Sequence, residues 1–265
     1  MNRVKDFAAA LQDKRLGHVL LELLLLVAGI LIALAVNGWI EDRREATSER
    51  LYLERLARDF NQDLDVLDEF VSFEERQTND AVLAYRPLCG GAAVDDREEV
   101  ARALDHLTGR RTIRFARATY SDLLSTGNLR LIRDAALRDR IVRLYESNER
   151  WAAIIDRNNQ VYVDQLYLGF MMGAGLVEPH PDSNLPSVGP PRQAFARRLG
   201  TPVRSPKDRL WNLPPDKLDV LCGTLWYRGF ISMQSIDQAK AVAKQITVVR
   251  DEIAGVPGRD SPGKK

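Results

Sequence analysis

The sequence predicts an all-α protein, in which one apolar helix near the N-terminus continues into a bundle of three long helices and several short ones. Two patterns predict this class: an apolar run at residues 19–40, and three later segments with apolar residues at steps of three and four. A third observation speaks against strands, because no alternating apolar and polar run is flanked by hairpin turns.

The charge balance and the apolar content of the chain exclude two classes of protein. The formal net charge of the 265 residues is +1, so no global polycation draws the chain to nucleic acid. Hydrophobic residues make up 45% of the chain, which is too many for a disordered protein. We therefore expect a folded protein without a nucleic-acid partner.

The run at residues 19–40 is apolar apart from Glu22 and Asn37. A helix of this length, rising about 1.5 Å per residue, crosses a hydrocarbon layer of about 30 Å. Trp39 lies at the C-terminal edge, where aromatic side chains anchor a helix at the membrane interface. The run therefore predicts a transmembrane helix, with the lipid bilayer as its partner.

Two other interpretations of the run stay open. One is a buried helix of a soluble core, although core helices rarely stay apolar on all sides over such a length. The other is a cleaved signal peptide, because Lys14 and Arg15 precede the run and residues 33–35 (Ala-Leu-Ala) have the form of a cleavage site. The length of the run and the helical pattern that follows it favour an uncleaved anchor.

The orientation depends on the Lys and Arg residues near the membrane, which slightly favour a cytoplasmic N-terminus. Those before the run are Arg3, Lys5, Lys14 and Arg15, and those after it are Arg43, Arg44 and Arg50. A short N-terminus before a long domain also fits an uncleaved signal anchor. We expect residues 1–18 in a bacterial cytoplasm, the single-pass anchor in the inner membrane and the domain in the periplasm, while the opposite orientation stays open.

The anchor has one face that differs from the rest of the helix. Glu22, Leu26, Gly29, Ala33 and Asn37 follow one another at steps of four, three, four and four, so they share this face. The pair of small residues permits close approach of a second helix, and a carboxyl group in hydrocarbon indicates a function. The pattern predicts association with another copy of the chain or with another membrane protein. Alternatively, Glu22 simply lies protonated or snorkelling near the membrane edge.

Two stretches resemble a known family. They are GILIALAVNGWIEDRR at residues 29–44, and YSDLLSTGNLRLI at residues 120–132 followed by Leu137, Ile141 and Tyr145. They resemble an uncharacterised family of bacterial single-pass membrane proteins with a G-I-L-I-A-L-x-x-N-x-W anchor motif. The resemblance covers about a fifth of the chain. It implies membrane anchoring and a helical body, but no established activity, so it transfers no catalytic role.

A bundle domain is expected at residues 41–254. Its first long helix spans residues 41–85, where a stripe of apolar residues alternates steps of three and four: Leu53, Leu56, Phe60, Leu64, Leu67 and Val71. Apart from Gly38, neither Pro nor Gly separates this helix from the anchor, so the two can form one stalk. Short helices are expected near residues 95–107, with Asp95 and Asp96 at the N-terminal end, and near residues 120–125.

The other two long helices are predicted at residues 134–176 and 214–254. The stripe of the second consists of Leu137, Ile141, Leu144, Trp151, Ile155, Tyr162 and Leu166. That of the third consists of Leu218, Leu221, Leu225, Gly229, Ile236, Ala243, Ile246 and Ile253. Together the helices predict a four-helix-like core. Residues 255–265 are rich in Gly, Pro and Lys and are expected to be disordered.

A Pro-rich crossover is predicted at residues 178–215. It contains a group of basic residues with few acids, namely Arg192, Arg197, Arg198, Arg204, Lys207 and Arg209. These residues suggest a basic contact surface for anionic lipid headgroups or an acidic partner. The alternative is a solvated loop that wraps around the bundle.

The two cysteines, Cys89 and Cys222, have no spacing that suits zinc. In an oxidising periplasm they can form a disulfide, whereas in the cytosol they would be two small buried hydrophobic residues. The amides Asn148, Asn158 and Gln165 lie on or next to the stripe of the second long helix, where they can line a polar site or fix the helix register.

The sequence contains no catalytic, cofactor or metal-binding motif. We therefore expect no cofactor and no enzyme. The leading hypothesis is a membrane-anchored binding or assembly protein that engages a protein partner or a small ligand at the cell envelope. A sensing bundle that acts through a second membrane protein is the first alternative, and an enzyme of unknown class is the second.

Overall fold

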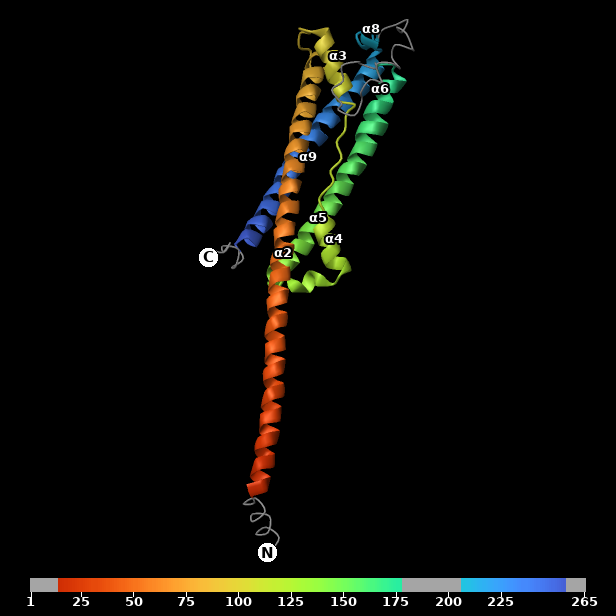
Figure 1. Ribbon diagram of the computed structural model, residues 1–265. Coiled ribbons are helices and arrows are strands. Elements are labelled where there is room, and N and C mark those ends of the chain that lie inside the picture. Colours follow the sequence, from red (N-terminus) through yellow and green to blue (C-terminus); the bar gives the residue numbers. More distant parts are fainter. Residues whose placement is uncertain (1–13, 178–205, 256–265) are drawn as a thin grey trace, which may run out of the picture.

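The computed structural model describes residues 14–177 and 206–255. Every regular element in these two ranges is a helix, so the predicted all-α class is confirmed. Figure 1 shows a long rod in which the helices of the domain pack side by side around the upper part of one very long helix.

That helix, α2 (Lys14–Cys89), is 76 residues long and contains both the apolar run and the first helix of the domain. Its length is about 110 Å at about 1.5 Å per residue. The lower part stands free of the other elements, and the upper part forms one side of the bundle (Figure 1). Gly38 does not interrupt the helix, so the anchor and the domain share one continuous backbone.

Short elements connect the distal end of α2 to the second long helix. They are α3 (Arg97–His106), α4 (Ala118–Ser125) and the 3-10 turn η1 (Asn128–Leu131). Asp96 caps α3 by accepting hydrogen bonds from the amides of Glu98 and Glu99. Gly127 begins η1 with a φ of 69°, a conformation that glycine adopts without strain.

The second long helix is composed of α5 (Ala135–Asn158), the π-helix η2 (Asn159–Leu168) and α6 (Gly169–Gly173). The predicted stripe is correct up to Ile155 and wrong beyond it, because Val163 and Tyr167 are buried whereas Leu166 is exposed. The wider turn of a π-helix shifts the buried face relative to an α-helical period. The structure therefore continues the stripe at steps of four, through Asn159, Val163, Tyr167 and Met171.

The last elements are the short helix α8 (Pro206–Leu210) and α9 (Pro215–Ala254), which runs antiparallel to α2 (Figure 1). Both long helices have a strict seven-residue repeat, which is typical of coiled coils. On α2 the positions of this repeat, all of them buried, are Leu53, Leu56, Phe60, Asp63, Leu67, Phe70, Glu74, Gln77, Ala81 and Ala84. On α9 the matching positions are Leu221, Leu225, Arg228, Ser232, Ser235, Ala239, Val242, Ile246, Val249 and Ile253.

An extended segment, residues 109–117, takes the place of a fourth helix in the four-helix-like core that we expected. It runs between α3 and α4 along the bundle (Figure 1). Buried Ile113 and half-buried Phe115 alternate with Arg114, which suits an extended backbone. Asp63 accepts a hydrogen bond from the amide of Ala116 at 2.7 Å, and Asn159 donates one to the carbonyl of Arg111 at 2.9 Å.

The core consists of two apolar clusters separated along the rod. The cluster nearer the predicted anchor, which we call the proximal cluster, contains Phe60, Phe70, Tyr145 and Trp151, and the distal cluster contains residues such as Tyr167. Between them the repeats of α2 and α9 bring polar side chains into the interior, namely Glu74, Gln77, Arg228, Ser232 and Ser235, which we call the polar layer.

Candidate functional site

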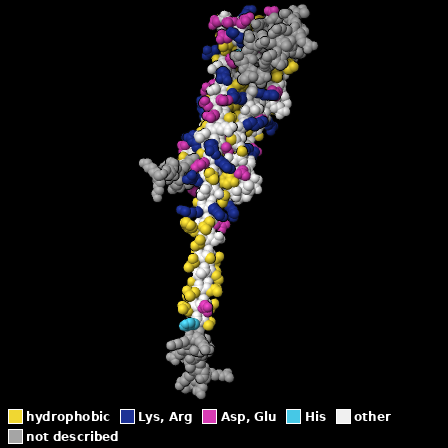
Figure 2. Space-filling view, viewed as in Figure 1, with side chains coloured by type: hydrophobic (Ala, Val, Ile, Leu, Met, Phe, Trp, Pro, Cys, Tyr) yellow, Lys and Arg dark blue, Asp and Glu magenta, His cyan; other side chains and the backbone are white. Residues whose placement is uncertain are grey.

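Within the described ranges, one helix is long and apolar enough to cross a membrane, and it contains the predicted anchor. Its most apolar 18-residue window has a mean hydropathy of 3.0, and none of that window is buried against the rest of the chain. Figure 2 shows hydrophobic side chains along the lower rod, whereas charged side chains gather on the upper part.

The predicted association face lies on this free part of α2. Glu22, Gly29, Ala33 and Asn37 all belong to one uninterrupted helix, so their spacing does place them on one face. A Cβ atom added at Gly29 would meet nothing within 4 Å. The space beside the two small residues is therefore open in a single copy of the chain.

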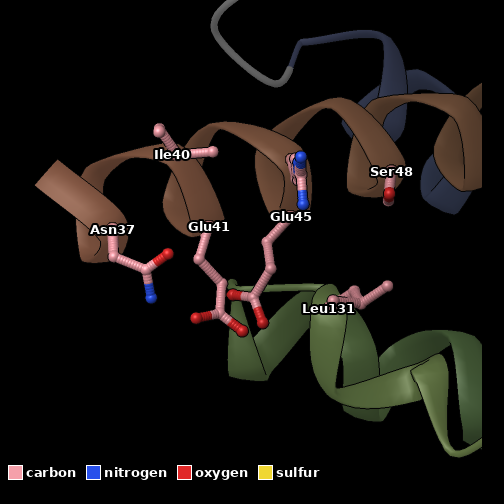
Figure 3. Close-up of a pocket in the computed structure, with 7 residues that line it drawn as sticks. Asn37, Ile40, Glu41, Glu45, Ser48 and Leu131 are labelled. Carbon is pink, nitrogen blue, oxygen red and sulfur yellow. The ribbon is translucent and has the colours of Figure 1, made fainter.

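A recess of about 420 Å³ continues this face at the point where the anchor meets the domain (Figure 3). Glu41 and Glu45 point toward the segment that contains Leu131, and Asn37 points to the same side of the helix (Figure 3). The complete lining consists of Asn37, Ile40, Glu41, Arg44, Glu45, Ser48 and Leu131. We call this the juxtamembrane recess. Sequence reasoning missed it because Leu131, which closes one side, is remote in the chain.

The wall of the recess that η1 provides is fixed to α2 by polar contacts. The amide of Arg133 donates to Glu49 Oε1 at 2.7 Å, and its guanidinium donates to the carbonyl of Asp42 at 2.9 Å. Asn128 donates to the hydroxyl of Tyr52 at 3.0 Å. These contacts hold the recess open without a ligand.

At the far end of the rod, a disulfide joins Cys89 to Cys222, with a Cα–Cα distance of 5.7 Å. Cys89 is the last residue of α2, and Cys222 lies in the first turns of α9. The bridge therefore ties together the membrane-distal ends of the two helices of the coiled coil.

Most of the predicted basic contact surface lies outside the described residues. This is the case for Arg192, Arg197, Arg198 and Arg204, and for the side chain of Lys207. Arg209 is described, and its guanidinium lies 3.5 Å from the carbonyl of Gly175, just after α6. It thus contributes a local contact between α8 and the end of α6.

The polar layer is centred on Arg228, whose side chain is only 2% exposed. The guanidinium lies 3.3 Å from Glu74 Oε2 and donates to Gln77 Oε1 at 2.9 Å and to the carbonyl of Gly109 at 3.3 Å. Ser232 is a further partner. The layer links α2, α9 and the extended segment, and no motif in the sequence indicated it.

A second buried polar group lies in the proximal cluster. Burial raises the pKa of Asp63 from 3.8 to about 7, although the hydrogen bond from Ala116 lowers it and nearby Asp59 raises it further. Tyr145 is buried beside these carboxyls, and burial raises its pKa as well. Asp63 Oδ2 and the Tyr145 hydroxyl have no hydrogen-bond partner in the structure.

The three amides of the second long helix are not gathered into one site. Asn148 is buried, and neither atom of its amide has a hydrogen-bond partner, whereas Asn158 is half-buried and Gln165 is exposed. In residues 14–177 and 206–255, no group of three His, Cys, Asp or Glu side chains has the arrangement of a metal site.

Comparison with known proteins gives one match. A model of a family of unknown function, DUF6090, matches residues 22–167, which is more than half of the chain. The matched range includes most of the anchor, the juxtamembrane recess and both stretches on which the sequence resemblance rests. No similar curated protein was found. No similar solved structure was found either.

Proposed function

Because the chain belongs to the DUF6090 family, whose function is unknown, we propose from its own geometry that it is a single-pass membrane protein for assembly. In this proposal the anchor pairs with the anchor of a second copy, and the helical rod presents the domain to partners at the cell envelope. The observation that supports it best is the polar and small face of the anchor, which the chain itself leaves uncovered.

Physical chemistry favours a partner on this face. An ionisable residue in a membrane helix normally faces another helix or a polar cavity, because its exposure to lipid is costly. Glu22 and Asn37 lie on the same side as Gly29 and Ala33. A glycine and an alanine four residues apart let two backbones approach closely, which brings the polar groups of neighbouring helices within hydrogen-bonding reach.

A bulky substitution at Gly29 tests this assembly, and Gly38 offers a matched control. Both glycines belong to the free helix, and a Cβ atom at either one would meet nothing within 4 Å. They are nine residues apart, which places them on opposite sides of the helix. We expect Gly29→Leu to reduce energy transfer between two labelled copies in membranes, and Gly38→Leu to leave it unchanged.

Unchanged energy transfer in both Gly29→Leu and Ala33→Leu would exclude this face as the contact. Ala33→Leu has its own control in Ala35→Leu, because Ala35 lies on the other side of the helix. Membrane extraction with alkaline carbonate should be run on each variant, so that loss of the contact is distinguished from loss of the anchor.

We further propose that the domain lies in the periplasm. The proximity of Cys89 and Cys222 supports this, since such pairs oxidise in the periplasm and stay reduced in the cytosol. Alkaline-phosphatase and fluorescent-protein fusions after Ala254 test the orientation. Phosphatase activity without fluorescence is the expected result. The cysteines should also resist maleimide labelling until they are reduced. Fluorescence without phosphatase activity would reverse the orientation.

Ligand sensing is a second candidate function, favoured by the unpartnered buried atoms of Asp63, Tyr145 and Asn148. Buried polar atoms normally have partners, and a small polar ligand or ordered water would supply them. A reproducible rise in melting temperature with one metabolite, absent in Asn148→Leu, would support this candidate. The absence of a shift across a panel of polar metabolites would leave ordered water as the explanation.

A further inference from the structure

We propose that the juxtamembrane recess binds the headgroup of a phospholipid with an ammonium group as well as a phosphate, as in an ethanolamine phospholipid. The inference rests on the proposed membrane anchor and adds a binding site to it. It uses the position of the recess along α2, the charges that line it and the fixed wall that η1 provides.

The position of the recess matches the headgroup layer. The apolar run ends at Ile40, and the lining residues from Glu41 to Ser48 extend about 12 Å further along the helix axis. The headgroup region adds about 5–8 Å to each side of the hydrocarbon core. A recess that begins at the end of the apolar run therefore opens at the depth where phosphates and ammonium groups lie.

The lining offers charges of both signs that the described part of the chain does not pair. Among these residues, neither a hydrogen bond nor an ion pair links the side chains of Glu41, Arg44 or Glu45 to another group. Glu49, one turn further along, contrasts with them, because it is paired with Arg133. The lining of the recess thus includes two free carboxylates, those of Glu41 and Glu45, and the free guanidinium of Arg44.

This combination suits a zwitterionic amine headgroup better than an anionic one. An ammonium group has three donors for the carboxylates of Glu41 and Glu45, and the guanidinium of Arg44 can bind a phosphate with two hydrogen bonds. A glycerol headgroup would place its phosphate beside two carboxylates without an ammonium group to offset them. A choline headgroup has the charge but no N–H donor.

The site is built before a lipid arrives. Arg133 and Asn128 fix η1 against α2 through three hydrogen bonds, so Leu131 provides an apolar wall opposite the charged side chains. Since α2 continues through the recess without a break, the lining residues of the helix have a fixed spacing. A lipid therefore binds without the entropy cost of ordering a loop.

Anchor pairing leaves room for this lipid. Helices that meet at a small-x-x-x-small pair cross at about 40°. Glu41 lies about 12 Å beyond Ala33 along the axis of α2. At that height the crossing angle displaces the axis of the second helix sideways by about 8 Å from its position beside Ala33. The gap between the two helices at the membrane surface is then open to lipid.

The test is native mass spectrometry of the full-length protein in detergent, with ethanolamine and glycerol phospholipids of identical acyl chains. An ion pair at a partly exposed site contributes up to about 1 kcal/mol, or about a fivefold change in affinity. We expect the wild type to prefer the ethanolamine lipid about fivefold, Glu41→Gln/Glu45→Gln to abolish that preference, and Arg44→Gln to weaken the binding of both lipids.

Asp42→Asn is the matched control, because Asp42 has the same depth but its side chain does not line the recess. It should keep the preference of the wild type. Equal binding of both lipids by the wild type, or a preference that survives Glu41→Gln/Glu45→Gln, would overturn the proposal. Alkaline extraction of the same wild-type protein separates this failure from failure of the anchor, because a protein that is not anchored would leave the membrane fraction.

Discussion

Replacing Arg228 by Met tests whether the polar layer is a paired, buried network. Arg228 is 2% exposed and Glu74 is 4% exposed, and their charged groups lie 3.3 Å apart. Met keeps most of the length of the Arg stem, so the main change is that the buried carboxyl of Glu74 loses its partner. Breaking a buried ion pair in this way costs about 3–5 kcal/mol. This is a large fraction of the roughly 5–15 kcal/mol that stabilises a typical domain.

The double substitution Glu74→Leu/Arg228→Met separates the charge effect from packing. It removes both charges, so the cost of an isolated carboxylate disappears and the remaining loss is that of the unpaired Gln77 amide and Gly109 carbonyl, about 1–3 kcal/mol. The free energy of unfolding can be measured by urea titration of the full chain in detergent, followed by circular dichroism. A cost below about 1 kcal/mol for Arg228→Met, or a double variant as unstable as the single one, would refute the reasoning.

Three further predictions concern Asp63, the disulfide and the glycines. The pKa of Asp63 is about 7 in the folded protein, above its ordinary 3.8, so the folded state holds the proton more tightly and stability falls as pH rises from about 4 to 7. Asp63→Asn keeps an acceptor for the Ala116 amide. Urea titrations should show this variant to be more stable than the wild type at pH 8, by up to about 4 kcal/mol, but not at pH 4. Equal stabilities at pH 8 would contradict this prediction. Because the cysteines are 133 residues apart, reduction of the bridge should cost about 5 kcal/mol, seen as a lower melting temperature, and the Cys89→Ser/Cys222→Ser variant should show no further loss on reduction. Gly127→Ala should lower stability by about 1 kcal/mol, because Gly127 has a positive φ. Gly223 lies on an exposed part of α9, where an added Cβ atom would meet nothing within 4 Å, so Gly223→Ala should raise stability. The opposite order of the two melting temperatures would contradict the backbone argument.

The sequence predicted the long helices because their apolar residues repeat at a period that only a helix can bury on one side. The stripe from Leu53 to Leu67 is an example, and the structure buries both residues as expected. The same reasoning did not place Asp63, Glu74 and Gln77 in the core, although they occupy positions of the same seven-residue repeat. Polar residues at such positions look like a solvated face until the partner helix is known to bring Arg228 opposite them.

Other features could not be predicted because they depend on contacts between remote segments. The π-helix after Asn158 has no local marker in the sequence, and its effect is visible only in the shift of burial from Leu166 to Tyr167. The juxtamembrane recess likewise needs η1 to be brought against α2 by Arg133 and Asn128. The anchor face was predictable, since a single helix fixes the relative positions of Gly29 and Ala33 without any tertiary contact.

The continuity of α2 also limits how two copies can meet. Leu53, where the buried core begins, lies 20 residues after Ala33, which at about 100° per residue is a rotation of about 200°. Two copies that pair through Ala33 therefore place their bundles on the outer sides of the pair. The η1 segment, whose Leu131 lines one side of the recess, then keeps the α2 helices of the two copies apart above the membrane.

This geometry predicts where two copies can be cross-linked. Leu26 and Arg44 lie seven and eleven residues from Ala33, so all three share one face of the helix. A photoreactive side chain at Leu26 should capture a second copy in membranes, seen as a dimer band on a denaturing gel, whereas the same side chain at Arg44 should capture lipid instead. Strong dimer bands from Arg44 would mean that the helices stay in contact beyond the anchor, with the second copy in the recess. Because the bundles and η1 occupy the space above the membrane on either side, we expect the contact to end near Asn37.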